Sequence, residues 1–178
     1  MSSLLQELLG NVLSGEGVEA LAKKSGADAD TIKNIANDGL PVLLQSIMGN
    51  AKDGASVASL GKALSDHAAK DASPLTQIAE ADTTDGKKII GHLLGNKTET
   101  VEADLAKKAG ASTDIVSTVL ASLAPMVMSQ VGKSVSSSTG FSDSDNNDLS
   151  SLLKNVMKDG DGDGTPDVIK GLMGLFKK

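Results

Sequence analysis

Alternating carboxylates near the C-terminus are the residues whose types and spacing most clearly suggest chemistry. The stretch from Asp159 to Asp167 reads DGDGDGTPD. It places acidic residues at positions 1, 3, 5 and 9 of an EF-hand calcium loop and a glycine at position 6, where that loop turns sharply. We expect a calcium site there, with the ligands Asp159, Asp161, Asp163, Thr165 and Asp167.

Two residues depart from the EF-hand pattern. Lys170 stands at position 12, where a bidentate glutamate is usual, and Pro166 stands at position 8. The loop also resembles the DxDxDG repeats of calcium-binding extracellular and cell-envelope proteins, which tolerate a missing position 12. We therefore expect weak calcium binding, and the alternative is an acidic, flexible turn. Asp143 and Asp145 form a poorer second candidate.

Catalytic chemistry has few candidate residues in this sequence. The chain has no cysteine, and its two histidines are His67 and His92. His92 lies in an apolar stretch, where we expect half-buried packing, and His67 ends a polar helix near Asp66. No phosphate loop, dinucleotide fingerprint or zinc motif is present in the sequence. We expect a protein that is not an enzyme, with no bound cofactor apart from calcium.

Composition favours an all-α fold. Aromatic residues make up 1% of the chain, so the core must be built from aliphatic residues, as in helix-on-helix packing. The net charge of −6 argues against non-specific binding to nucleic acid, because phosphate repels an acidic chain. The first residues lack the basic start of a signal peptide, and we find no apolar stretch of about 18 residues that could cross a membrane. The expected location is the cytoplasm, with no membrane association.

An internal repeat organises the first three quarters of the chain. The segment LAKKSGA at 21–27 matches LAKKAGA at 105–111, at an offset of 84 residues. Pro41 and Pro125 keep the same offset, as do apolar positions on both sides of each proline. The sequence therefore predicts a duplicated helical domain over residues 1–135, with copies at about 1–52 and 85–135.

Each copy is expected to contain four short helices. In the first copy the predicted helices are about 3–13, 18–24, 30–37 and 41–51, with Pro41 in the first turn of the last one. Residues 53–84 should supply connecting helices at about 56–69 and 74–81, and the cluster DTTD at 82–85 should cap the helix that follows. Residues 136–148 are a polar linker. Residues 149–178 are expected to form a helical hairpin around the calcium loop, ending in an apolar helix that packs on the body, docks on a partner or lies on a membrane surface.

A corner like that of a helix-turn-helix recurs in both copies. Ala22 and Gly26, followed by Ile32 and Ile35, have the spacing of two helices joined by a tight turn. The would-be recognition helix begins with acidic residues and has a single cation, Lys33, whereas base reading requires cationic or amide side chains. We therefore expect a structural corner and treat DNA binding as the weaker alternative.

The patterns LLGN, LAKKSGAD, GKKIIGHLLGN and LAPMVM resemble a bacterial family of unknown function, the YidB-like group, catalogued as domain-of-unknown-function family 937. The resemblance covers about residues 1–135. It implies an all-helical fold with a homeodomain-like element, and it implies no activity, cofactor or catalytic residue. The calcium loop lies outside the pattern.

Together these features predict a non-enzymatic helical interaction or scaffold protein with a weak calcium loop. A protein partner or self-association is expected, and no small-molecule substrate is inferred. The alternatives are a calcium-responsive regulatory binder and a DNA-binding protein.

Overall fold

The computed structural model describes residues 3–53 and 55–139. Within these ranges the chain is helical and contains no strand, which confirms the all-α fold class. The order of elements is α1 (Ser3–Val12), α2 (Gly15–Ser25), α3 (Ala29–Lys52), α4 (Val57–Ala68), α5 (Pro74–Ala79), α6 (Thr83–Leu94), the 3₁₀ turn η1 (Gly95–Lys97), α7 (Thr98–Ala109) and α8 (Thr113–Thr139).

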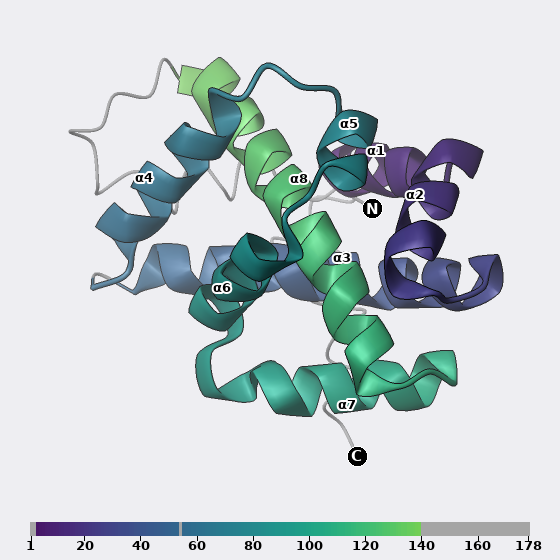
Figure 1. Cartoon of the computed structure of the whole chain (residues 1–178). Helices are drawn as coiled ribbons and strands as arrows, with labels where there is room; N and C mark the ends of the chain where they lie inside the picture. Colours follow the sequence, from purple (N-terminus) through teal and green to yellow (C-terminus); the bar gives the residue numbers. More distant parts are fainter. Residues whose placement is uncertain (1–2, 54, 140–178) are drawn as a thin grey trace.

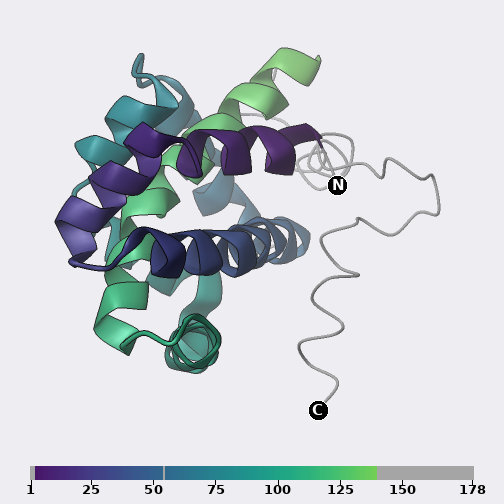
Figure 2. The same ribbon diagram turned by 90° about the vertical axis from the view of Figure 1, so that its right-hand side faces the viewer.

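Helix α8 runs through the centre of the body, crossing α3, with the remaining helices arranged around these two (Figures 1 and 2). It contacts every other α-helix. The segment 121–132 is buried on all sides. Its polar residues are therefore satisfied internally, since buried polar groups need partners. Gln77 Nε2 of α5 donates to Ser129 Oγ at 3.1 Å, and Ser122 Oγ donates to the carbonyl of Thr118 at 2.8 Å.

Two predicted helix breaks are wrong. Residues 30–37 and 41–51 belong to one continuous helix, α3, with Pro41 inside it, and Pro125 likewise lies inside α8. A proline inside a helix removes one backbone hydrogen bond and costs about 3 kcal/mol. Burial offsets that cost, because Leu40 and Leu44 on either side of Pro41 are fully buried. Each predicted copy therefore holds three helices instead of four.

The prediction that no segment could span a membrane is also wrong on length and composition. The 24-residue segment Thr113–Ser136 of α8 contains an 18-residue window with a mean hydropathy of 1.5. The sequence contains no long uninterrupted apolar run here, because serine, threonine, glycine and proline residues are scattered through the segment. The mean hydropathy over the window is nevertheless apolar. In the structure 78% of this window is buried against the other helices, as in the core helix of a helical body.

Close contacts between helices occur at glycines. A Cβ on Gly86 of α6 would collide with the backbone of Ala121, and one on Gly132 of α8 would collide with the backbone of Leu64. Only a residue without a side chain allows these backbones to approach so closely. The glycines therefore set how α6 and α4 lie against α8, and these are the helices that form the pocket described next.

Candidate functional site

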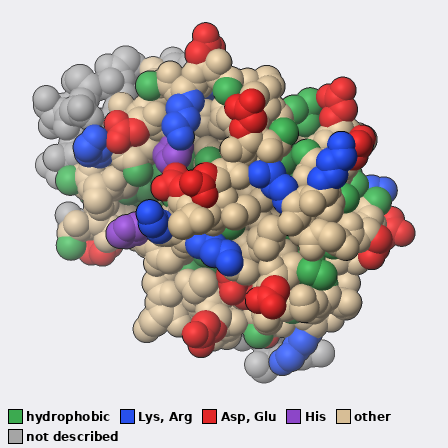
Figure 3. Space-filling view, in the orientation of Figure 1, with side chains coloured by type: hydrophobic (Ala, Val, Ile, Leu, Met, Phe, Trp, Pro, Cys, Tyr) green, Lys and Arg blue, Asp and Glu red, His purple; other side chains and the backbone are tan. Residues whose placement is uncertain are grey.

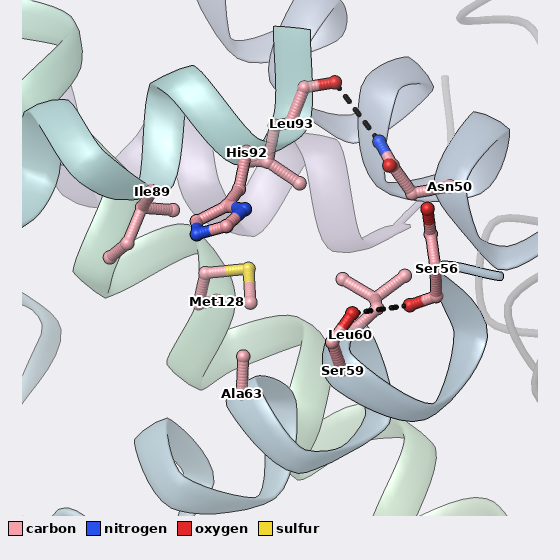
Figure 4. Close-up of a pocket in the computed structure, with 9 residues that line it drawn as sticks. All are labelled: Asn50, Ser56, Ser59, Leu60, Ala63, Ile89, His92, Leu93 and Met128. Carbon is pink, nitrogen blue, oxygen red and sulfur yellow. Dashed lines mark hydrogen bonds between the residues drawn. The ribbon is translucent and has the colours of Figure 1, made fainter. Parts of the chain in front are cut away.

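A half-open pocket lies where the end of α3, the start of α4, the end of α6 and the middle of α8 meet (Figure 4). Its volume is about 200 Å³. The lining combines apolar and polar side chains from these four helices: Asn50, Ser56, Ser59, Leu60, Ala63, Ile89, His92, Leu93 and Met128.

Helical spacing places these residues on common faces. Ser56, Ser59, Leu60 and Ala63 follow one another at intervals of three and four residues, so they share one side of α4. The same spacing joins Ile89, His92 and Leu93 on α6. Asp82 fixes where α6 begins, because its carboxylate accepts hydrogen bonds from the backbone N–H groups of Thr84 and Asp85. This confirms the capping cluster predicted at 82–85.

The hydroxyl groups at the pocket have already used their hydrogens. Ser59 Oγ donates to the carbonyl of Ser56 at 2.9 Å, and Ser56 Oγ donates to Asp53 Oδ2 at 2.8 Å. A hydroxyl carries one hydrogen, so both oxygens can only accept a further bond. With the carboxylate of Asp53 beside them, they form a rim, which we call the acceptor rim, suited to an N–H or ammonium group.

Asn50 connects two walls of the pocket. Its Nδ2 donates to the carbonyl of Leu93 at 3.0 Å (Figure 4) and also to the carbonyl of Ser46 at 2.8 Å. The first bond joins the end of α3 to the end of α6. The bond to Ser46 holds the Asn50 amide against its own helix, α3. The Asn50 side chain therefore helps to set the distance between α3 and α6 at the pocket.

The two histidines lie in different surroundings. His92 is exposed at the pocket, so the predicted half-buried packing is wrong: it lies on the α6 face that opens to the pocket mouth. His67 is partly buried, and its Nδ1 is shielded from solvent with no hydrogen-bond partner. Burial, and secondarily the charge of Lys70, lowers the pKa of His67 below its usual 6.5, although Asp85 and Asp66 oppose this shift.

The two corners found in the sequence have matching local geometry. Gly26 and Gly110 end α2 and α7 with φ angles of 73° and 67°, and their N–H groups donate to the carbonyls of Ala22 and Ala106. Asp28 caps α3 by accepting from the N–H of Thr31, and Ser112 accepts from the N–H of Ile115 at the start of α8. The apolar residues that hold the second helix of each corner against the core are fully buried: Ile32 and Ile35 in the first corner, and Val116 and Val119 in the second.

The lysine pairs Lys23–Lys24 and Lys107–Lys108 lie in the last turns of α2 and α7. They also make specific contacts. Lys24 Nζ donates to the carbonyl of Ala81 at 2.7 Å, and Lys108 Nζ lies 3.7 Å from Asp38 Oδ2. Lysine and carboxylate side chains are interspersed over the face shown in Figure 3, so this face presents no continuous basic surface for phosphate.

Comparison with known families gives one match. A family model described as "Bacterial protein of unknown function (DUF937)" matches residues 7–134. The chain belongs to this family. The match confirms the resemblance seen in the sequence, and the whole pocket lies inside the matched residues. No curated protein and no solved structure gives a significant match.

The DUF937 match ends before the predicted calcium loop. Asp159, Asp161, Asp163, Thr165 and Asp167 also lie outside the residues that the structure describes. Among the described residues, no group of three or more histidine, aspartate or glutamate side chains is arranged to hold a metal ion. The calcium site therefore remains a prediction from the sequence.

Sequence reasoning missed the pocket of this DUF937 protein. Of its nine lining residues, only His92 was considered as chemistry, and it was assigned to packing. The spacing of Ser56, Ser59 and Ala63 on α4 was a usable signal, since small residues on one helix face leave space. What the sequence could not give was the partner for that face, which comes from α6 and α8, more than 25 residues further along the chain.

Proposed function

We propose that the helical body is a non-enzymatic interaction module, and that its pocket receives one apolar side chain of a protein partner. The observation that carries this proposal is the pocket itself, which has an apolar floor and the acceptor rim. Leu60, Ile89 and Met128 supply the floor, and Ser56 and Ser59 supply the rim.

The size of the pocket suits an anchor side chain better than a large ligand. Drug-sized ligands occupy pockets of about 300–1,000 Å³, whereas this one measures about 200 Å³. A dry cavity of about 150 Å³ lined by apolar residues accepts benzene. One leucine, methionine or phenylalanine side chain would therefore fill the space, and interfaces often depend on such single anchors.

The acceptor rim adds a chemical preference to this size limit. Because Ser56 and Ser59 can only accept, a partner with a lysine or a free N–H beside its apolar anchor would bind better than one with a carboxylate there. The carboxylate of Asp53 strengthens that preference. The favoured partner motif is thus an apolar residue close to a cation.

Catalysis is a poorer account of the same pocket. Acid–base or nucleophilic chemistry needs a base within hydrogen-bond reach of a reacting group and a third group that orients it. The pocket hydroxyls donate to a backbone carbonyl and to Asp53 instead of to His92. We therefore keep the non-enzymatic interpretation.

The matching corners support a duplicated origin for the body. Residues 84 positions apart cap and terminate equivalent helices: Gly26 with Gly110, and Asp28 with Ser112. We propose that both corners are structural. At the first one the exposed cation Lys33 lies 3.8 Å from Asp30, so the helix start offers DNA a balanced ion pair instead of net positive charge.

Calcium binding by the loop Asp159–Asp167 is the second candidate function, and alternating carboxylates favour it. A calorimetric calcium titration of the full chain should release or absorb heat that the variant Asp161→Ala lacks. Equal heats for both proteins would remove the loop as a calcium site.

Selection from a library of random short peptides tests the proposed interaction. The full chain should enrich peptides with one apolar residue close to a lysine or arginine. Ala63→Phe, which fills the pocket from α4, should abolish this enrichment. Ala58→Phe, at an exposed position of the same helix, is the matched control and should retain it. Equal enrichment by both variants would contradict binding in the pocket.

A further inference from the structure

We propose that the occupant of this pocket is the C-terminal segment of the same chain, residues 172–178, with the ring of Phe176 in the cavity and Lys177–Lys178 at the acceptor rim. This inference rests on the proposed function and names its ligand. It makes the chain a self-occluded interaction module, in which an external partner must displace the segment.

The segment has the chemistry that the pocket selects. It reads LMGLFKK, with two lysines directly after the phenylalanine. A phenyl ring is about the size of the benzene that fills a cavity of about 150 Å³, so it fits a pocket of about 200 Å³. The ammonium groups provide donors for Ser56, Ser59 and Asp53, whose oxygens can only accept.

Phe176 also supplies what the described body lacks. The chain has two phenylalanines and no tyrosine or tryptophan, and both phenylalanines lie outside the described residues. On the helix expected from the sequence, Leu172, Leu175 and Phe176 share one side. The pocket offers Leu60, Ile89 and Met128 to that side, and a methionine sulfur beside an aromatic ring is a favourable contact.

Charge favours the same pairing. Residues 1–139 contain twelve lysines against sixteen carboxylates, which gives the body a net charge of −4. The segment contains two lysines and no acidic side chain. Among the described residues that line the pocket none is a lysine.

The chain is long enough to reach. Met128 at the pocket and Thr139, the last described residue, are 11 residues apart on α8, or about 16 Å along the helix. Thirty-two residues separate Thr139 from Leu172. Even at the helical rise of about 1.5 Å per residue, a stretch of that length extends about 48 Å, which exceeds the distance back along α8, so the segment can bind within its own chain at an effective concentration on the order of millimolar. The tethered segment would therefore occupy the pocket even if its affinity is too weak for a separate peptide to bind.

The test uses the full chain with labelled methionine methyl groups, followed by NMR. The resonance of Met128 is identified by its loss in Met128→Leu. Replacing Phe176 by leucine removes a ring but keeps an apolar side chain, so the Met128 resonance should move by more than its linewidth. Phe141→Leu is the matched control and should leave that resonance in place. A nuclear Overhauser effect should join the Phe176 ring to the Met128 methyl group, at the same intensity on dilution.

Two results would overturn the proposal. The first is a Met128 resonance that is unchanged in Phe176→Leu, with no Overhauser effect to the Phe176 ring. The second is a contact that disappears on dilution, which would place the segment of one copy in the pocket of another.

A further variant separates this inference from the proposed function. In Leu172→Ser/Leu175→Ser/Phe176→Ser the segment can no longer fill the pocket, and peptide selection is repeated on this full-length variant. Stronger enrichment than with the unchanged chain supports self-occlusion. Equal enrichment overturns self-occlusion and leaves the interaction pocket standing. No enrichment from either protein overturns both.

Discussion

Asn50 on α3 and Leu93 on α6 are joined by a hydrogen bond of 3.0 Å from the side-chain amide to the backbone carbonyl. The two residues are 43 positions apart and lie on neighbouring walls of the pocket (Figure 4). Because the amide also holds the carbonyl of Ser46, its position is fixed from two sides. The width of the pocket therefore depends on a polar contact as well as on apolar packing.

Asn50→Ala should lower the free energy of unfolding by about 1–2 kcal/mol, because it leaves the Leu93 carbonyl without this donor. Urea unfolding followed by circular dichroism measures the change. Asn37→Ala, at an exposed position on the same helix, should change stability by less than about 0.5 kcal/mol. Equal effects at the two positions would show that the bond contributes nothing specific.

Gly86→Ala should destabilise the protein by about 1–3 kcal/mol or more, because the new Cβ would meet the backbone of Ala121. Gly91→Ala on the same helix has open space around it and should instead stabilise by about 0.5–1 kcal/mol, since alanine is the better helix former. Thermal unfolding of the two variants gives the comparison. The changes in stability should have opposite signs in the two variants. A similar loss of stability in both would contradict the close packing of α6 on α8.

Gly26→Ala and Gly110→Ala should destabilise the protein by similar amounts, about 1 kcal/mol each, because both glycines have a left-handed backbone with open space around them. Gly10→Ala, in the interior of α1 with nothing nearby, should be neutral or stabilising. Chemical denaturation of the three variants tests whether the corners are equivalent. A large difference between Gly26→Ala and Gly110→Ala would argue against equivalent corners.

Stability should depend on pH through His67. Burial holds its pKa in the folded protein below 6.5, so as pH falls through about 6.5 the unfolded chain binds a proton before the folded chain does. The free energy of unfolding should therefore be highest above that pH and should fall as pH decreases toward the folded pKa. His67→Gln should flatten this slope, measured by urea unfolding between about pH 7.5 and 5.5. His92→Gln, at the exposed histidine, is the control, and the same slope in both variants would contradict the account.

Much of the fold could be predicted from the sequence, because it depends on local patterns. Helix ends depend on residues close by in the chain. The glycines of the LAKK…GA segments end α2 and α7, and Asp82 caps the start of α6, where the patterns indicate. The breaks at Pro41 and Pro125 were predicted wrongly for the opposite reason. A local cost at proline is outweighed by burial against helices that are distant in the sequence.

The pocket could be predicted even less well from local sequence patterns. Each wall carries an ordinary pattern of spaced residues on one helix, and the cavity forms where these helices meet, with Gly86 and Gly132 at the close contacts of α6 and α4 with α8. Those contacts belong to the tertiary structure. His92 was predicted to be half-buried but lies at the pocket mouth. The pattern of its own helix does not show which residues of α4 lie beside it.

The central claim is that the pocket accepts a single apolar side chain beside a cation, and one titration tests it most directly. The peptide Gly-Leu-Phe-Lys-Lys, identical to residues 174–178, is added to the full chain carrying Leu172→Ser/Leu175→Ser/Phe176→Ser, and the Met128 methyl resonance is followed. The account predicts a saturable movement of this resonance that is absent when Ala63→Phe is added to the same chain. A resonance that stays in place at the highest peptide concentration, or that moves equally with Ala63→Phe present, would contradict the claim.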